Sequence, residues 1–240
     1  MNHSESIGGP PIAKVESRQP PRAPRLRTLR RFRHNVFIGL AAFAVGLAAW
    51  VVFDTARLRE GLSIATAYAG LVLLAASLAL GPLNLLRRRA NPVSSDLRRD
   101  IGIWAASCGL IHVVAGLGVH MGGNVARYFM PPPEAQSLSP LRLDAFGFAN
   151  HLGLIGALFL LLLLLVSSDR ALRRLGAPRW KRIQRLNYLA AVAVVVHGIL
   201  YQLLERRGTL LVISFVATIA AALLLQAAGR RTYLRRRATG

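Results

Sequence analysis

Apolar and polar stretches alternate along this chain with the spacing typical of membrane-spanning helices. The apolar segments run approximately over residues 36–53, 62–86, 101–120, 147–167, 186–204 and 209–228. Each is close to the roughly 20 residues that a helix needs to cross the hydrocarbon core of a bilayer. The pattern therefore predicts an all-α integral membrane protein, with a bundle of six transmembrane helices over residues 36–228.

The basic residues divide unevenly between the two sides that such a topology would create. Of the 31 Lys and Arg residues, 25 fall on one side, in residues 1–35, 87–100, 168–185 and 229–240. Because Lys and Arg concentrate in cytoplasmic loops, we expect both termini in the cytoplasm and an even number of spans. A multi-pass protein of the bacterial inner membrane would show this distribution.

The segments outside the predicted spans differ in composition and in the structure that they are expected to form. Residues 1–35 are rich in Pro and Arg, which predicts a disordered basic cytoplasmic tail. Residues 229–240 are predicted to form a second basic cytoplasmic tail. The stretch 121–146 is expected to be the longest loop on the opposite, periplasmic side.

Composition and motifs exclude several classes of protein. The chain is 53% hydrophobic yet has a formal net charge of +21. Its basic residues lie between apolar runs and not on one face of a soluble domain, so we expect contact with membrane lipid and no nucleic-acid partner. The single cysteine, Cys108, excludes an internal disulfide, a paired-cysteine metal site and covalent haem attachment. The sequence contains no glycine-rich nucleotide-binding motif.

Two histidines lie deep within predicted spans, where ionisable side chains are costly and mark functional sites. His112 and His197 each lie roughly 18–21 Å along their helices from the cytoplasmic side. Two histidines at one depth on different helices suit the two axial positions of a b-type haem. Small residues flank both, namely Cys108, Gly109, Ala115, Gly116, Ala190, Ala193 and Gly198. The alternative is that these small faces allow close helix packing and that each His bonds a neighbouring carbonyl.

Other candidates lie near the periplasmic ends of the helices. His120 and His151 would meet there if they held a second haem or a metal ion; the alternative is that they are solvated or cap their helices. Arg127, Arg206 and the adjacent Arg207 are candidate partners for haem propionates, as is Tyr201. The alternatives are snorkelling of the arginines to lipid headgroups and simple packing of the tyrosine.

Several stretches resemble the ferric reductase-like transmembrane domain. Residues 98–104 (Arg-Arg-Asp-Ile-Gly-Ile-Trp) followed by Leu110-Ile111-His112 resemble its third helix. Residues 152–168, 172–176 and 179–182 (Arg-Trp-Lys-Arg) resemble its fourth helix and inner loop, and residues 186–197 resemble its fifth helix. Together the resemblance covers roughly residues 62–205. The length is similar to that of small bacterial members, above all the haem-binding membrane subunit of the periplasmic methionine-sulfoxide reductase system.

This resemblance implies haem b as the redox centre, with His112 and His197 on the ligand positions. The family often has a further His four residues after the Trp of the inner-loop motif, where this chain has Gln184. A second, inner haem is therefore doubtful, and one haem cannot by itself bridge about 30 Å of hydrocarbon. An inner carrier such as FMN, a quinone or a partner flavoprotein would have to supply electrons. The basic stretch 170–185 is a candidate docking surface for it; the alternative is an ordinary basic cytoplasmic loop.

Taken together, these features predict a membrane cytochrome b subunit. It would relay electrons from a cytoplasmic-side donor to a periplasmic oxidoreductase, as the electron-transfer subunit of a larger enzyme system. Two alternatives stay open. One is a stand-alone reductase of ferric iron or another small acceptor, and the other is a non-redox membrane transporter or scaffold.

Overall fold

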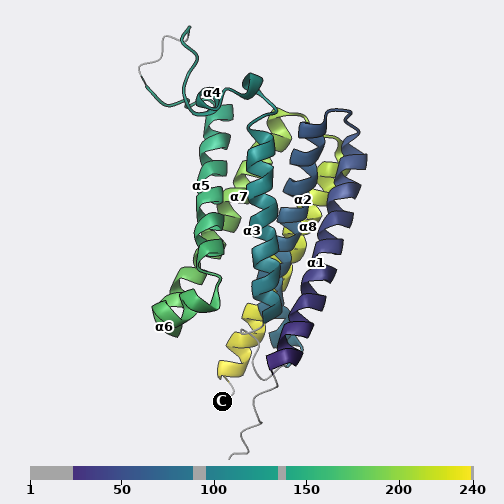
Figure 1. The fold of residues 1–240 in the computed structure, drawn as a ribbon, viewed down its shortest axis with the longest axis vertical. Coiled ribbons are helices and arrows are strands. Elements are labelled where there is room, and N and C mark those ends of the chain that lie inside the picture. The colour runs from purple at the N-terminus through teal and green to yellow at the C-terminus, as the bar shows by residue number, and fades with distance from the viewer. Residues whose placement is uncertain (1–23, 89–95, 135–138, 239–240) are drawn as a thin grey trace, which may run out of the picture.

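The computed structural model describes residues 24–88, 96–134 and 139–238, with the backbone alone for residues 24–27. Helices account for most of the described residues, and Figure 1 shows the long ones running side by side. They are α1 (Pro24–Phe53), α2 (Leu58–Leu86), α3 (Asp96–Gly116), α5 (Ala145–Leu165), α7 (Leu186–Leu204) and α8 (Thr209–Ala238). Shorter elements are the 3₁₀ turn η1 (Met121–Gly123), α4 (Ala126–Phe129) and α6 (Asp169–Gln184).

The prediction of an all-α membrane protein is confirmed. Five helical stretches within the described residues are long and apolar enough to cross a membrane: Thr28–Phe53, Leu58–Leu86, Ala145–Leu165, Asp169–Leu204 and Thr209–Ala238. The fourth comprises α6 and α7. The helix α3 is not among them, because Asp96, Arg98, Arg99 and Asp100 occupy its first turns and His112 interrupts its apolar stretch. The span predicted over residues 101–120 is thus a helix of suitable length with a less apolar sequence.

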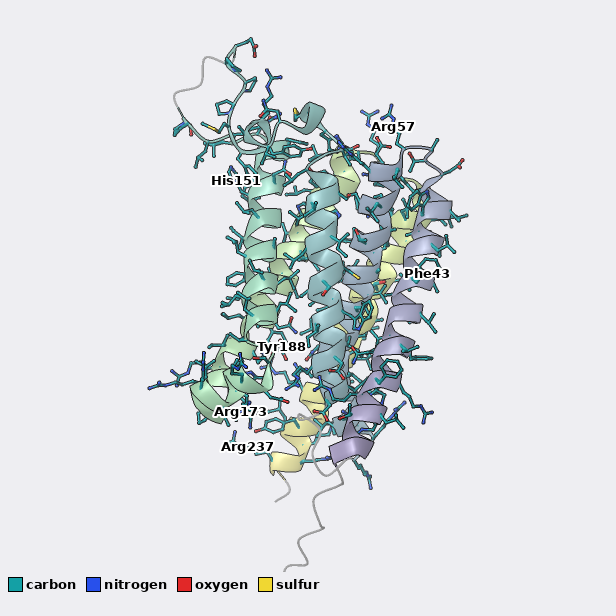
Figure 2. The ribbon with its side chains drawn as sticks, viewed as in Figure 1. Phe43, Arg57, His151, Arg173, Tyr188 and Arg237 are labelled. Atoms are coloured by element: carbon teal, nitrogen blue, oxygen red, sulfur yellow. The ribbon has the colours of Figure 1, made fainter. Side chains whose placement is uncertain are left out.

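Large apolar side chains cover the outside of the bundle. Phe37 and Phe43 of α1 are 74% and 68% exposed, and Leu223 and Leu224 of α8 are 63% and 70% exposed. Figure 2 shows Phe43 pointing away from the helices. A soluble monomer rarely exposes so much contiguous apolar surface, whereas lipid tails accommodate it.

The long helices form two groups. Helix α2 packs against α1, α3 and α8, and these four are called the four-helix group; α5 packs mainly against α7, and these two are called the helix pair. The groups join along α3 and α5. A cluster of buried side chains crosses this seam, with Leu73, Ala105 and Cys108 from the four-helix group and Leu160 and Ala190 from the helix pair.

The two ends of the bundle differ in charge. The end that carries Arg173 and Arg237 in Figure 2 is called the basic end, and the end that carries Arg57 and His151 is called the loop end. The described chain begins and ends at the basic end (Figure 1). This arrangement agrees with the uneven division of basic residues that the sequence contains.

Ion pairs fasten the helices together at the basic end. Arg31 of α1 donates to the Asp100 carboxylate of α3 at 2.6 Å, and Asp100 is only 1% exposed. Arg30 pairs with Asp96 at 3.3 Å, and Arg99 of α3 pairs with Asp169 of α6. The pairs made by Arg30 and Arg31 stabilise the N-terminal part of α1, which begins at Pro24. The prediction that residues 1–35 are disordered is wrong for residues 24–35, and residues 1–23 lie outside the described residues.

Other predicted boundaries also change. The stretch 168–185, expected to be a loop, contains the helix α6, which begins at the cap residue Ser168 and bends at Gly176, where φ is +71°. Much of the predicted tail 229–240 is helical, because α8 continues as far as Ala238. Apolar periodicity did not reveal these segments, because they are helices with polar, exposed sides. In contrast, α3 ends at Gly116 and not at residue 120.

The Arg31–Asp100 pair generates a stability prediction. We expect Asp100→Ala to lower the midpoint of thermal unfolding in detergent by roughly 5 °C, because it leaves a partly buried guanidinium without its partner. The matched control is Arg57→Ala, which removes a pair whose arginine side chain is 80% exposed. The control is expected to change the midpoint by less than about 2 °C. Equal shifts in the two variants would contradict this assignment.

Candidate functional site

A cavity of about 410 Å³ lies between the four-helix group and the helix pair. Towards the basic end its walls are apolar, with Leu74, Ala105 and Leu160. Towards the loop end they become polar, and there the lining includes Glu60, His120, Gln202, Glu205 and Arg207. A cavity of this size and polarity gradient suits a planar, mostly apolar ligand with a charged edge.

His112 and His197 face this cavity from its two sides. His112 belongs to α3 in the four-helix group, and His197 belongs to α7 in the helix pair. The centres of their rings are 6.2 Å apart, with an angle of 71° between the ring planes. The structure therefore brings together the two histidines that the sequence placed at one depth.

Each imidazole is anchored to a backbone carbonyl of its own helix group. The Nδ1 atom of His112 lies 2.9 Å from the carbonyl oxygen of Ser63 in α2. The Nδ1 atom of His197 lies 2.8 Å from the carbonyl oxygen of Ala149 in α5. A carbonyl oxygen only accepts, so Nδ1 must be the protonated nitrogen in both rings.

This choice of tautomer has a chemical consequence. In a neutral imidazole with Nδ1–H, the Nε2 atom carries a free lone pair, which is the form that binds a metal. Metal-bound histidines almost always donate their other N–H in this way. One alternative from the sequence was that each His bonds a neighbouring carbonyl, and both bonds are present. They use Nδ1, and the Nε2 atoms of His112 and His197 take no part in them.

Small residues make these carbonyls accessible. A helical carbonyl at position i already accepts from the N–H of residue i+4, so an extra donor must pass the side chain at i+4. That position is Ala67 for Ser63 and Gly153 for Ala149. A Cβ atom added to Gly153 would lie 2.7 Å from Nδ1 of His197. The absence of a side chain at residue 153 is therefore what lets His197 reach its acceptor.

At the loop end, His120 lies beside a carboxylate that the sequence did not indicate as its partner. Its Nε2 atom lies 3.5 Å from the Glu205 carboxylate, and its ring contacts Tyr201 and Phe146. His151 does not line the cavity; its ring contacts Phe129. The two histidines thus have different surroundings, and a second haem or metal between them stays an untested prediction.

The candidate propionate partners also differ in whether they line the cavity. Tyr201 lines the cavity, its ring centre is 4.9 Å from that of His197, and its hydroxyl donates to Asn150 at 2.9 Å. Arg127 and Arg206 do not line the cavity, whereas Arg207 does, with its guanidinium 4.6 Å from the ring centre of Phe53. Among the three arginines, Arg207 is the one placed at the polar end of the cavity.

Tyr128 is a structural residue that sequence reasoning missed. Its ring is 2% exposed, and its hydroxyl accepts from the N–H of His120 and donates towards the carbonyls of Gly116 and His120. Burial raises the pKa of this phenol. Because Tyr128 satisfies backbone groups just beyond α3, it explains why the helix ends at Gly116 and how the following turn holds His120 over the cavity.

The start of α5 is fixed in a similar way. Asp144 caps the helix by accepting from the N–H of Gly147 at 2.7 Å. The Arg142 guanidinium, bonded to the same carboxylate, and this cap hold the pKa of Asp144 below its usual range. The cap sets the register of the turn that contains Ala149 and Gly153.

This is a multi-pass, all-α membrane protein with two histidines facing each other across an internal cavity. The family model described as "Ferric reductase like transmembrane component" matches residues 66–195. The chain belongs to this family, which implies transmembrane electron transfer by way of haem. The matched range contains His112 and ends just before His197. No curated protein matches the sequence.

The cavity can be tested against the haem that this family implies. A metal–imidazole bond is about 2 Å long, and the ring centre lies about 1 Å behind its nitrogen, so two axial rings would have centres about 6 Å apart. The observed 6.2 Å agrees. Within the described ranges, no cluster of three or more His, Cys, Asp or Glu side chains could hold a metal ion. A macrocycle would supply the remaining ligands, so the residues present fit a haem.

The contact at Gly153 leads to a prediction that requires no cofactor. We expect Gly153→Ala to break the bond from His197 Nδ1 to the Ala149 carbonyl, because the new Cβ would overlap the ring. The readout is the Nδ1–H proton resonance of His197 in ¹⁵N-histidine-labelled protein, which should disappear or move upfield. The control is Gly102→Ala, where an added Cβ meets nothing within 4 Å. An unchanged His197 resonance in Gly153→Ala would contradict the role given to this glycine.

Proposed function

We propose that this protein is a membrane cytochrome b that relays electrons to an oxidoreductase on the loop-end side of the membrane, with His112 and His197 as the axial ligands of one haem b. The single observation that carries the proposal is the facing pair of imidazoles, 6.2 Å apart and each bonded to a carbonyl through Nδ1. In this proposal the protein is the haem-binding subunit of a periplasmic methionine-sulfoxide reductase system in a bacterial inner membrane.

The proposal includes six spans, with both termini in the cytoplasm. In addition to the five long apolar stretches, it counts α3 as a span. The 21 residues of α3 run beside α2 and α5 and include His112, one of the two proposed ligands. Its charged first turns are at the basic end, where Asp100 is neutralised by Arg31. The concentration of arginines at that end supports its assignment to the cytoplasm.

In this proposal the residues around the cavity have three roles: binding the iron, excluding water and balancing the charge of the propionates. His112 and His197 would hold the iron, and bound haem would supply one-electron chemistry between its ferric and ferrous forms. Leu74, Ala105 and Leu160 would exclude water from the apolar edge. Arg207 at the polar end would balance the charge of the propionates, with Tyr201 beside it.

Electrons would have to arrive from the basic end. Two buried side-chain nitrogens near that end, Nε of Arg99 and Nε2 of Gln184, have no hydrogen-bond partner among the described residues. Such donors favour a ligand with carbonyl or phosphate oxygens, as quinones and FMN have. The exposed cations of α6 add an electrostatic attraction for an anionic cofactor or an acidic flavoprotein.

The first test is a reduced-minus-oxidised visible spectrum of the purified protein with haem quantitation. We expect a b-type spectrum at about one haem per chain, lost in His112→Ala and in His197→Ala. The control is His34→Ala, which should retain it. Free imidazole should restore the spectrum to the ligand variants if they are folded. A folded, colourless wild-type protein from haem-replete cells would overturn the proposal and favour a transporter or scaffold.

One observation favours a second candidate, direct reduction of a small acceptor. The cavity extends to Val125, which is 48% exposed at the loop end. A ferric chelate could therefore approach the polar edge without a protein partner. Rapid, saturable oxidation of the reduced protein by a ferric chelate would favour this candidate, whereas slow, non-saturable oxidation would favour a protein acceptor.

A further inference from the structure

The two candidate ligands differ in the groups that surround their Nδ1 atoms. Among the described residues, the hydrogen-bond partner of His197 Nδ1 is the Ala149 carbonyl. His112 has two oxygens from one residue, the Ser63 carbonyl at 2.9 Å and the Ser63 hydroxyl at 3.1 Å. The single hydrogen on Nδ1 is thus shared between a carbonyl and a hydroxyl on the α2 side of the cavity.

The position of the Ser63 hydroxyl is well defined. Ser63 is only 7% exposed and lines the cavity. On its other side lies Gly116, one turn beyond His112 in α3, where an added Cβ would be 3.4 Å from the hydroxyl oxygen. The hydroxyl therefore occupies a narrow space between α2 and α3, 3.1 Å from Nδ1 of His112.

We propose that Ser63 is a positioning residue for His112, and that its hydroxyl strengthens electron donation from Nε2 of this ring. The inference rests on the proposed function. An acceptor for Nδ1–H makes an imidazole a stronger ligand and fixes its rotation about the metal–nitrogen bond. A stronger donor stabilises ferric iron over ferrous iron, so the Ser63 hydroxyl lowers the midpoint potential of the haem. The two axial ligands are consequently unequal, with His112 the stronger donor.

The test uses substitutions that separate the hydroxyl from the space it fills. Ser63→Thr and Ser63→Val have nearly the same volume but differ in the hydroxyl. Ser63→Ala removes the hydroxyl without adding bulk. The matched control is Ser77→Ala, on the same helix, whose serine is 2% exposed and bonds the carbonyl of Leu74 and not a histidine.

Each variant is purified with its haem, and the midpoint potential and the low-spin ferric electron paramagnetic resonance spectrum are measured. We expect Ser63→Ala and Ser63→Val to raise the ferrous-to-ferric ratio at fixed poise about threefold, a rise of about 30 mV at 59 mV per tenfold change. Their g values should shift as well. Ser63→Thr and Ser77→Ala should match the wild type in both measurements.

The possible outcomes distinguish a failure of the inference about Ser63 from a failure of the proposed function. Equal potentials and spectra for Ser63→Thr and Ser63→Val, at full haem content, would overturn the role of the hydroxyl and leave the proposed function standing. Equal shifts in Ser63→Ala and Ser77→Ala would reduce the effect to general packing of α2 and would also overturn it. A wild-type protein that binds no haem would overturn the proposed function and this inference together.

Discussion

Two hydrogen bonds from imidazole Nδ1 atoms to helix carbonyls determine what the rest of this bundle can do. Each bond joins a histidine to the neighbouring helix of its own group, His112 to α2 and His197 to α5. The fold itself therefore orients both rings. The seam between the groups then sets their separation, and the charged contacts at the basic end hold α1, α3 and α6 in the register on which that separation depends.

Much of this arrangement could be predicted from the sequence, because hydrophobic length and charge asymmetry are strong signals. Each predicted apolar segment corresponds to one of the long helices, although two run a few residues past the helix end, and the matched depth of His112 and His197 indicated the facing pair. What could not be predicted depends on backbone atoms or on distant side chains. A carbonyl such as that of Ala149 has no sequence signature, and the contact between Glu205 and His120 depends on a turn after α3 that Tyr128 helps to hold. Gly153 did carry a signal, because it is a small residue in a predicted span, and the structure shows it against the ring of His197.

The helical segments beyond the predicted spans follow from contacts that hydropathy does not measure. Residues 24–35 are helical, and Arg31 within them pairs with a carboxylate buried in α3. Helix α6 is polar on one side, yet Trp180 donates to the Val166 carbonyl at the end of α5 and holds the helix against the bundle. Both segments extend the protein at the basic end, where the family-like inner-loop motif ends in Gln184.

The anchored rings also bear on the energetics of electron transfer. A site whose ligands are held by the fold changes its geometry little when the charge on a bound metal changes, so the reorganisation energy of the protein around it is small. Little conformational entropy remains to be lost when a cofactor binds. If His112 and His197 hold a haem as proposed, their bonds to the carbonyls of Ser63 and Ala149 would therefore favour fast electron exchange, and the choice of partner would fall to the surfaces at the two ends of the bundle.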